Sequence, residues 1–412
     1  MTVEPASPEA GADAPGLYVH VPFCSAICPY CDFAVLVGGP ERRAGFVPDL
    51  AAEAALHGGR ALPGGTFGTF DTLYLGGGTP SLLTPEQLAA LLAALRASLP
   101  VAPDAWITLE ANPEDVSDAA LQGWREAGVG TLSLGAQSFD DAALRFLGRR
   151  HDGAGARRAV ERALAAGFPI VSVDLIYGLP GLDEAGTARW RRDLGAAAEL
   201  GPPHLSCYQL TVHEGTPFGW RRARGRLGEL REPLQAELFR VTHEELGARG
   251  WEAYEVSNFA RSEASRSRHN AKYWRHAPYL GLGPSAHSFD GARRWWNHRK
   301  LPAWSAALAA GALPIAGEEP IGPSERALEH LMLGLRTREG VDLALLRTLG
   351  LDLEAHPVLP RLLDEGLLRR AGERLAATLA GWALADGVAA ALATPRAERA
   401  PGAGPAPTAV VS

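Results

Sequence analysis

The chain has 412 residues, of which 46% are hydrophobic and 21% are charged, and its formal net charge is −7 at pH 7. These values are typical of a globular protein with one large domain and one smaller domain. The negative charge argues against binding of nucleic acid, and the sequence lacks the run of about 18 apolar residues that a membrane span needs. Residues 1–15 carry neither a basic nor an apolar signal segment, so we expect a cytoplasmic location.

Short β-rich runs alternate six times with helical segments between residue 16 and about residue 212. The six expected strands are Leu17–Val21, Thr72–Leu75, Ile107–Glu110, Thr131–Leu134, Ile170–Ile176 and Leu205–Leu210. One intervening helix should begin at Thr84 as the N-cap, with Pro85 as its first helical residue. Repeated β–α units predict a parallel sheet that forms an open or closed barrel.

Each expected strand ends in glycine or in a polar residue. These ends are His20, Gly76–Gly78, Glu110, Gly135–Ser138, Asp174 and Tyr208–Gln209. In barrels, the loops at the carboxyl ends of the strands converge on one mouth. One or two such transitions are ordinary turns, but six in phase predict a lined pocket.

The alternation stops near residue 215, which divides the sequence into regions. We expect a disordered N-terminus (1–15), a core barrel (16–215), an extension (216–315), a small C-terminal helical domain (316–393) and a disordered tail (394–412). Within the C-terminal domain, Ala371–Thr378 should supply a turn and strand of a winged-helix-like unit.

Three of the four cysteines, Cys24, Cys28 and Cys31, lie within eight residues. In a reducing compartment, such thiols bind metal more often than they form disulfides, and thiolates suit zinc or iron–sulfur clusters. Most clusters take four cysteines, so a C-x₃-C-x₂-C loop leaves one iron free for another ligand. Zinc would need His20 or Cys207 as its fourth ligand. A structural cluster that used Cys207 would leave the glycine-rich loop unexplained, and we disfavour both alternatives.

This cysteine loop resembles the signature of the radical S-adenosylmethionine superfamily. The stretch Tyr18–Cys24 (YVHVPFC) resembles in particular the oxygen-independent coproporphyrinogen III oxidase family. The resemblance implies an α/β fold, a partial (β/α)₆ TIM-like barrel, with a [4Fe–4S] cluster on Cys24, Cys28 and Cys31. It also implies that S-adenosylmethionine chelates the free iron, and that one electron splits its sulfonium into methionine and a 5′-deoxyadenosyl radical.

The resemblance further implies cofactor contacts from several strand ends. Gly77, Gly78 and Thr79 match the family's G-G-T-P motif, which contacts the methionine amino group. Glu110 suits the ammonium or the ribose hydroxyls, with a salt bridge at the barrel mouth as the alternative. The other expected contacts are Tyr18, Tyr30, Gln137, Arg149 and Asp174. In some relatives, equivalents of the last three bind a second S-adenosylmethionine.

Two departures separate this chain from the decarboxylases of that family. Phe33 stands where they carry a further cysteine, and only about fifteen residues precede Tyr18, where they have a longer segment. Both features resemble the haem-chaperone branch of the family instead, and we assign no catalytic residue. The alternative is the oxidase reaction, in which the radical abstracts hydrogen from substrate propionates and CO₂ is released to leave vinyl groups. A radical enzyme with a non-porphyrin substrate is a weaker third possibility.

The segment from His269 to Trp274 contains H-N-x-x-Y-W, which resembles the sequence that the branch uses for haem. A neutral imidazole is a good iron ligand, so His269 is the expected haem ligand, with His287 in reserve. The accompanying residues are Tyr273 and Trp274 for the porphyrin face, and Arg266, Arg268 and Arg275 for the propionates. A hydrogen-bonded histidine among core aromatics is the structural alternative.

The resemblance also implies partners. We expect haem, an acceptor such as a respiratory haemoprotein, and a reductant such as flavodoxin or ferredoxin. Peripheral contact with a membrane is left open, while nucleic acid and a membrane-spanning segment are not expected.

Overall fold

The computed structural model describes residues 14–58 and 67–393. The two tails that the sequence predicts to be disordered therefore lie almost wholly outside the described residues. One compact unit extends to Gly322, and a second begins at Pro323.

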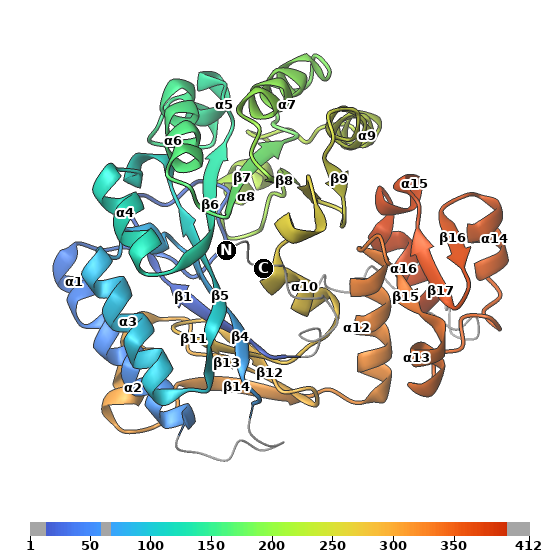
Figure 1. Ribbon diagram of the computed structural model, residues 1–412. Helices are drawn as coiled ribbons and strands as arrows, with labels where there is room; N and C mark the ends of the chain where they lie inside the picture. The colour runs from blue at the N-terminus through green and yellow to red at the C-terminus, as the bar shows by residue number, and fades with distance from the viewer. Residues whose placement is uncertain (1–13, 59–66, 394–412) are drawn as a thin grey trace, which may run out of the picture. The chain divides into compact units, whose positions relative to one another are not determined.

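The first unit is built on a sheet whose central six strands are parallel and follow one another in chain order, as the sequence predicts (Figure 1). These strands are β1 (Gly16–Val21), β4 (Phe70–Gly77), β5 (Val101–Ala111), β6 (Val129–Gln137), β7 (Ile170–Tyr177) and β8 (His204–Gln209). Each strand pairs in parallel with the next. Since parallel strands end at the same edge, the polar strand ends lie along one rim.

Helices connect these strands on the outer side of the sheet (Figure 1). They are α1 (Pro40–Ala44), α2 (Phe46–Gly58), α3 (Pro85–Ser98), α4 (Asp118–Glu126), α5 (Asp141–Phe146), α6 (Gly153–Ala165) and α7 (Ala188–Leu200). Helix α3 begins as predicted, because Thr84 accepts a hydrogen bond from the Gln87 backbone and Gln87 returns one to Thr84.

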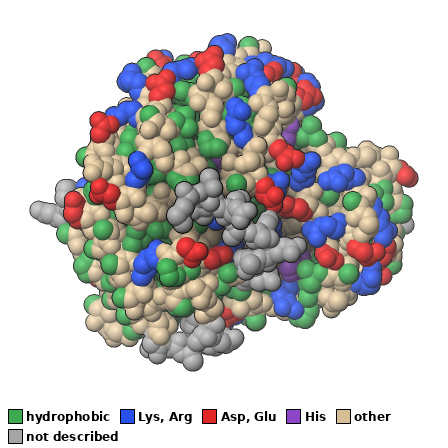
Figure 2. Space-filling model, viewed as in Figure 1, with side chains coloured by type: hydrophobic (Ala, Val, Ile, Leu, Met, Phe, Trp, Pro, Cys, Tyr) green, Lys and Arg blue, Asp and Glu red, His purple; other side chains and the backbone are tan. Residues whose placement is uncertain are grey.

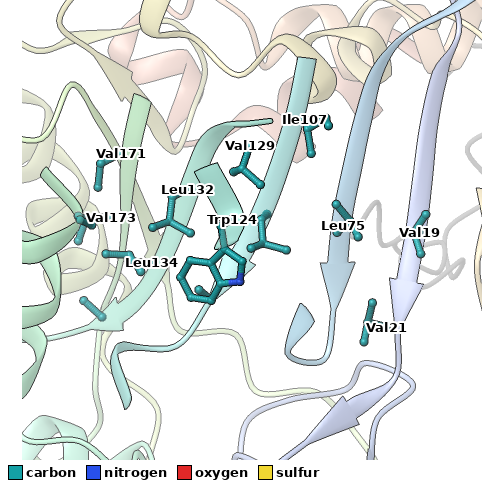
Figure 3. Close-up of a cluster of buried hydrophobic side chains, with 14 of the residues drawn as sticks. Val19, Val21, Leu75, Ile107, Trp124, Val129, Leu132, Leu134, Val171 and Val173 are labelled. Atoms are coloured by element: carbon teal, nitrogen blue, oxygen red, sulfur yellow. The ribbon is translucent and has the colours of Figure 1, made fainter. Parts of the chain in front are cut away.

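Aliphatic side chains from successive strands form the core between the sheet and the helices. Figure 3 shows this set, which includes Leu75, Leu132 and Val173 from three strands together with the Trp124 indole of α4. Alternate strand residues point away from this core toward the concave face. The packing therefore holds the strands in register and aims Tyr18, Tyr74 and Glu110 at the concave side.

Short strands extend the sheet at both edges, which the sequence analysis did not predict. At one edge, β11 (Tyr279–Leu282) pairs in parallel with β1, and β12 (His287–Phe289), β13 (Arg293–Asn297) and β14 (Ile315–Pro320) follow as antiparallel strands. At the other edge lie β10 (Asn258–Ala260) and β9 (Glu252–Ala253). The helices of this region are α8 (Pro217–Ala223), α9 (Glu232–Ala248), α10 (Arg268–Trp274) and α11 (Leu301–Ala309).

The second unit combines helices with a three-stranded antiparallel sheet. Its elements are α12 (Pro323–Leu335), β15 (Val341–Asp342), α13 (Leu343–Thr348), α14 (Leu359–Asp364), β16 (Leu368–Ala371), β17 (Arg374–Ala377), α15 (Leu379–Trp382) and α16 (Ala385–Ala393). Strand β17 lies between β15 and β16. The order helix, strand, two helices and a hairpin agrees with the predicted winged-helix-like unit.

Acidic and basic side chains are interspersed on the face that Figure 2 shows. Within residues 14–58 and 67–393, no helix is long and apolar enough to cross a membrane.

Candidate functional site

The three clustered cysteines lie on one loop at the carboxyl end of β1. Cys24 ends β2 (Phe23–Cys24), which pairs with β3 (Leu36–Val37), and the intervening loop carries the other two. A turn joins them, since the Cys31 amide donates to the Cys28 carbonyl at 3.2 Å. All three thiols are half-buried. The loop therefore presents three soft ligands next to the barrel mouth.

Polar donors from the end of β4 and from the segment between α5 and α6 point at two of the sulfur atoms. The Thr79 hydroxyl donates to Cys24 Sγ at 3.5 Å, and the Arg149 guanidinium donates to Cys28 Sγ at 3.4 Å. Hydrogen bonds to sulfur are one way in which proteins tune iron–sulfur clusters. Burial raises the pKa of the Cys24 thiol and that of Cys31, the latter to about 11, so a bound metal must displace their protons.

The thiols are not arranged for a single metal ion. Among the residues that the structure describes, no group of three His, Cys, Asp or Glu side chains could hold one ion. A [4Fe–4S] cube binds each cysteine at a different iron, so its ligands stand further apart than those of one ion. Both fourth ligands considered for zinc are engaged elsewhere: His20 is hydrogen bonded, and Cys207 is buried in the core.

His20 links the end of β1 to the cysteine loop. Its Nε2 donates to the Ala34 carbonyl at 3.0 Å, so Nδ1 accepts from the Tyr18 hydroxyl at 3.1 Å. Burial lowers the pKa of His20 to about 4, which keeps the ring neutral. A Cβ at Gly77, where φ is +104°, would lie 2.5 Å from this ring. Close approach and backbone conformation therefore both require glycine at position 77.

Two half-buried carboxylates face the pocket from β5 and β7. Glu110 accepts from the Tyr74 hydroxyl at 2.7 Å and from the Gly77 amide at 3.2 Å, whereas Asp174 accepts from the Ser133 hydroxyl at 3.1 Å. Burial, together with the charge of Asp174, raises the pKa of Glu110 to about 7, and burial raises that of Asp174 to about 6. No ion pair to either carboxylate occurs within the described part of the chain. Such a site favours a cationic ligand such as a sulfonium or an ammonium.

A chain of hydrogen bonds joins the two sulfur-binding donors. Arg149 donates to Asn112 Oδ1 at 2.5 Å and to the Gly135 carbonyl at 3.1 Å, and Asn112 Nδ2 donates to the Thr79 hydroxyl at 3.2 Å. Arg149 Nε is buried without a partner among the described residues, which leaves a donor for a ligand. The sequence analysis gave Asn112 no role and considered His20 only as a zinc ligand, although both lie at strand ends.

The remaining expected contacts lie around this network. Gln137 ends β6 with φ at +65°, and a Cβ at Gly135 would lie 2.8 Å from its Nε2. Tyr30, on the cysteine loop, packs against Leu147 and Ile176, and its hydroxyl lies beside Cys28. Gly78 donates its amide to the Val21 carbonyl at 2.8 Å. The fold thus brings the predicted cofactor residues to one end of the sheet.

His269 does not lie in this pocket. Its side chain is 2% exposed, with Nδ1 at 3.0 Å from the Thr72 hydroxyl and Nε2 at 3.0 Å from the Tyr273 hydroxyl. Burial lowers its pKa to about 3. In this conformation, neither ring nitrogen is free for an iron. Ligation of haem by His269 stays a prediction, and it would require one of these hydrogen bonds to break.

The residues around His269 also have structural partners. Tyr273 packs on Tyr279, and Trp274 packs on Tyr254. The Arg268 guanidinium stacks on Trp106 at 4.1 Å. The Arg266 guanidinium lies over Tyr254 and pairs with Glu252. These contacts hold α10 on the sheet, and the roles expected of these residues toward a porphyrin stay predictions.

A parallel barrel with this cysteine loop defines the class of radical S-adenosylmethionine proteins. Residues 18–193 match the family model described as the radical SAM superfamily, and residues 321–384 match the HemN C-terminal domain. The chain is similar in fold to coproporphyrinogen III oxidase (HemN) from Escherichia coli, with a TM-score of 0.77 and 23% identity, covering 94% of this chain and 92% of that one.

Curated relatives show which family within this class the chain resembles. The chain is 38% identical to the heme chaperone HemW of Mycobacterium tuberculosis (strain ATCC 25618 / H37Rv), over 90% of this chain and 93% of that protein. It is also 38% identical to HemW of Escherichia coli K12, over 66% and 69%, and 34% identical to bovine radical S-adenosyl methionine domain-containing protein 1, mitochondrial, over 82% and 76%. The chain belongs to the HemW family.

Proposed function

We propose that this protein is a haem chaperone, which binds a [4Fe–4S] cluster, S-adenosylmethionine and haem and delivers haem to an acceptor protein. The observation that carries the proposal is the 38% identity, over nine-tenths of the chain, to a relative named as a haem chaperone. Phe33, in place of a further cysteine, supports the same branch.

Cys24, Cys28 and Cys31 would hold the cluster. They supply soft thiolates from one loop, and Thr79 and Arg149 already donate to two of the sulfur atoms. When bound, the reduced cluster supplies one electron to the sulfonium of S-adenosylmethionine. The role of the chain is to place these ligands at a buried strand rim, where bulk water is excluded.

The cofactor would lie between the cysteine loop and the ends of β4 to β7. Glu110 and Asp174 provide negative charge for its ammonium and sulfonium, and Gly77 and Gly78 let the backbone approach closely. Tyr18, Tyr30, Thr79, Gln137 and Arg149 complete the proposed contact set. The unpartnered Nε of Arg149 is a donor for a carboxylate or for a ribose oxygen.

Haem delivery needs further partners. We propose an acceptor haemoprotein, such as one of a respiratory chain, and a flavodoxin or ferredoxin as the reductant. A cytoplasmic location fits the thiol-based site.

The test offers the anaerobically reconstituted protein coproporphyrinogen III, with reductant and S-adenosylmethionine, in parallel with haem. Tight haem binding without formation of vinyl products supports the chaperone. Formation of those products would identify an oxidase and contradict the proposal. The Cys24→Ala variant serves as the matched control, because any radical turnover must disappear in it.

A further inference from the structure

Helix α8 and the turn that follows it form a basic segment on an acidic protein. Residues 216–231 contain five arginines and one glutamate, whereas the formal net charge of the whole chain is −7. The glutamate, Glu229, pairs with Arg222 at 2.9 Å. Within the described part of the chain, the other four arginines of this segment have no carboxylate partner. The segment therefore presents uncompensated positive charge to the solvent.

Helix α8 also places an exposed indole among these arginines. Phe218 and Gly219 are the buried residues of the helix, and the next residue, Trp220, has 57% of its surface exposed. Arg224 lies one turn further on, and its guanidinium donates to the Trp220 carbonyl at 3.5 Å. Tryptophan and arginine are among the residue types most enriched at the energetic centres of protein interfaces. We define the α8 surface as the exposed residues Trp220, Arg221, Arg224 and Arg226.

The segment that carries the α8 surface contacts the cysteine loop at two points. The Phe218 amide donates to the Pro29 carbonyl at 2.9 Å. His213, just before α8, has its Nδ1 at 3.6 Å from a carboxylate oxygen of Asp32. Pro29 and Asp32 each follow one of the clustered cysteines directly in the sequence. The contacts are therefore one residue away from two of the proposed cluster ligands.

The cysteine loop adds exposed apolar side chains of its own. Ile27, the residue before Cys28, is 50% exposed, and Phe33, two residues after Cys31, is 44% exposed. Exposed apolar side chains near arginines are typical of the composition of protein interfaces. Complexes that form for electron transfer are small and transient, so a surface of a few residues is enough for one.

The position of the α8 surface indicates which kind of partner it fits. In the proposed function, S-adenosylmethionine occupies the pocket side of the cysteine loop, so a protein that reduces the cluster has to dock on the solvent side. Electron transfer slows steeply with distance, which favours docking next to the loop. A positive surface attracts a partner of negative charge and speeds their encounter. An acidic electron carrier meets both conditions.

We propose that the α8 surface docks an acidic one-electron carrier protein that reduces the cluster. One electron passes from the reduced carrier to the cluster held by the three cysteines, the carrier is oxidised by one electron, and no covalent bond forms or breaks. Trp220 packs against the carrier, and the arginines of the α8 surface face its carboxylates. The inference rests on the proposed cluster and adds the surface through which its reductant acts.

The test measures binding of an acidic [2Fe–2S] ferredoxin to the full-length, cluster-loaded protein by calorimetry, and reduction of the cluster by electron paramagnetic resonance. The double variant Arg221→Glu/Arg224→Glu should weaken binding about tenfold or more and slow reduction by ferredoxin, because like charges then face each other. Added salt should weaken binding in the wild type and have a smaller effect in the variant. Trp220→Ala should also weaken binding, with the salt dependence unchanged.

Two controls separate docking from damage to the cluster. Dithionite should reduce the wild type and the double variant at the same rate, because a small reductant needs no docking surface. Arg125→Glu/Arg158→Glu, at exposed positions of the outer helices α4 and α6, changes the net charge by the same amount. This control variant should bind ferredoxin as the wild type does.

The outcomes distinguish this inference from the proposed function. Unchanged ferredoxin affinity and reduction in Arg221→Glu/Arg224→Glu would overturn the inference, and so would an equal loss in Arg125→Glu/Arg158→Glu. A wild type that dithionite reduces but that ferredoxin neither binds nor reduces would overturn it as well, with the proposed function intact. Normal reduction but lost haem transfer in Arg221→Glu/Arg224→Glu would assign the surface to the haem acceptor instead. If the wild type forms no reducible cluster, the proposed function itself is wrong.

Discussion

The rim of the parallel strands and the extension (216–315) differ in how their polar side chains are paired. At the rim, Glu110 and Asp174 are half-buried carboxylates that accept hydrogen bonds but have no described cationic partner, and Arg149 keeps a free donor. In the extension, the residues of the H-N-x-x-Y-W motif bond to one another and to the sheet. Carboxylates without a cationic partner and a buried donor without an acceptor indicate a ligand, whereas the paired groups of the extension indicate a structural contact. The role of a sequence motif can therefore be assigned only when the hydrogen bonds of its residues are known.

The largest effect should follow removal of a rim thiol. Cys24→Ala, Cys28→Ala and Cys31→Ala should each abolish the brown cluster after anaerobic reconstitution, because two thiolates cannot hold the cube. Iron analysis and absorbance measure this, with Cys207→Ala as a control that keeps its iron. Retention of four irons per chain in all three variants would remove the loop from the site.

The second-largest effect, on the affinity for S-adenosylmethionine, is expected from substitution of Glu110. Glu110→Gln should weaken binding of S-adenosylmethionine by about tenfold or more, since a buried charge facing the cationic ligand is lost. Calorimetry of the reconstituted protein measures it. An unchanged affinity would show that Glu110 makes only its internal hydrogen bonds to Tyr74 and Gly77.

The pH dependence of S-adenosylmethionine binding is a second test of the role of the Glu110 charge. The pKa of Glu110 is raised to about 7 by burial, so at lower pH the carboxyl holds a proton that a cationic ligand must displace. Affinity in the wild type should therefore fall as the pH drops from 8 to 6. In Glu110→Gln this dependence should be shallower. An identical profile in both proteins would assign the titration to another group.

Substitution of His269 tests whether this residue has a structural role in the extension. His269→Ala should lower the free energy of unfolding by about 3 kcal/mol, because buried hydroxyls of Thr72 and Tyr273 lose their partner. Thermal or denaturant unfolding measures it, with Tyr273→Phe as the control that removes a single hydrogen bond. A variant with unchanged stability would mean that the ring is free in solution, as a haem ligand should be.

Acid unfolding is a second test of whether the His269 ring is buried and neutral in the folded protein. Its pKa falls from 6.5 to about 3 on burial, so the unfolded chain binds a proton that the folded chain does not. The wild type should lose stability as the pH falls below about 6.5, and His269→Ala should lose less over that range. Equal slopes would contradict a buried neutral ring.

The smallest effect is expected far from both regions. Thr84→Ala removes the N-cap of α3 and should cost about 1 kcal/mol, while cofactor and haem binding stay unchanged. Thr84→Ser is the matched control, because its hydroxyl keeps the cap. A loss of cluster in Thr84→Ala would show that the rim depends on helix α3 more than its packing indicates.

The sequence by itself determined the six parallel strands, the start of α3 and the cysteine loop. Each of these depends on local patterns: apolar runs that end in polar residues, a capping pair, and ligand spacing along a few residues. The positions of Tyr18, Glu110 and Asp174 on one rim followed from the parallel order of the strands. These features were predictable because neighbours in the chain suffice to specify them.

Only the tertiary structure decided how residues distant in the chain meet. The strands that extend the sheet at its two edges have two to six residues each, too short for a periodic pattern, and pairing with their neighbouring strands defines them. The network from Arg149 through Asn112 to Thr79 joins the segment between α5 and α6 to the ends of β5 and β4. His269 is an example, because one of its hydrogen bonds joins it to Thr72, 197 positions earlier in the chain.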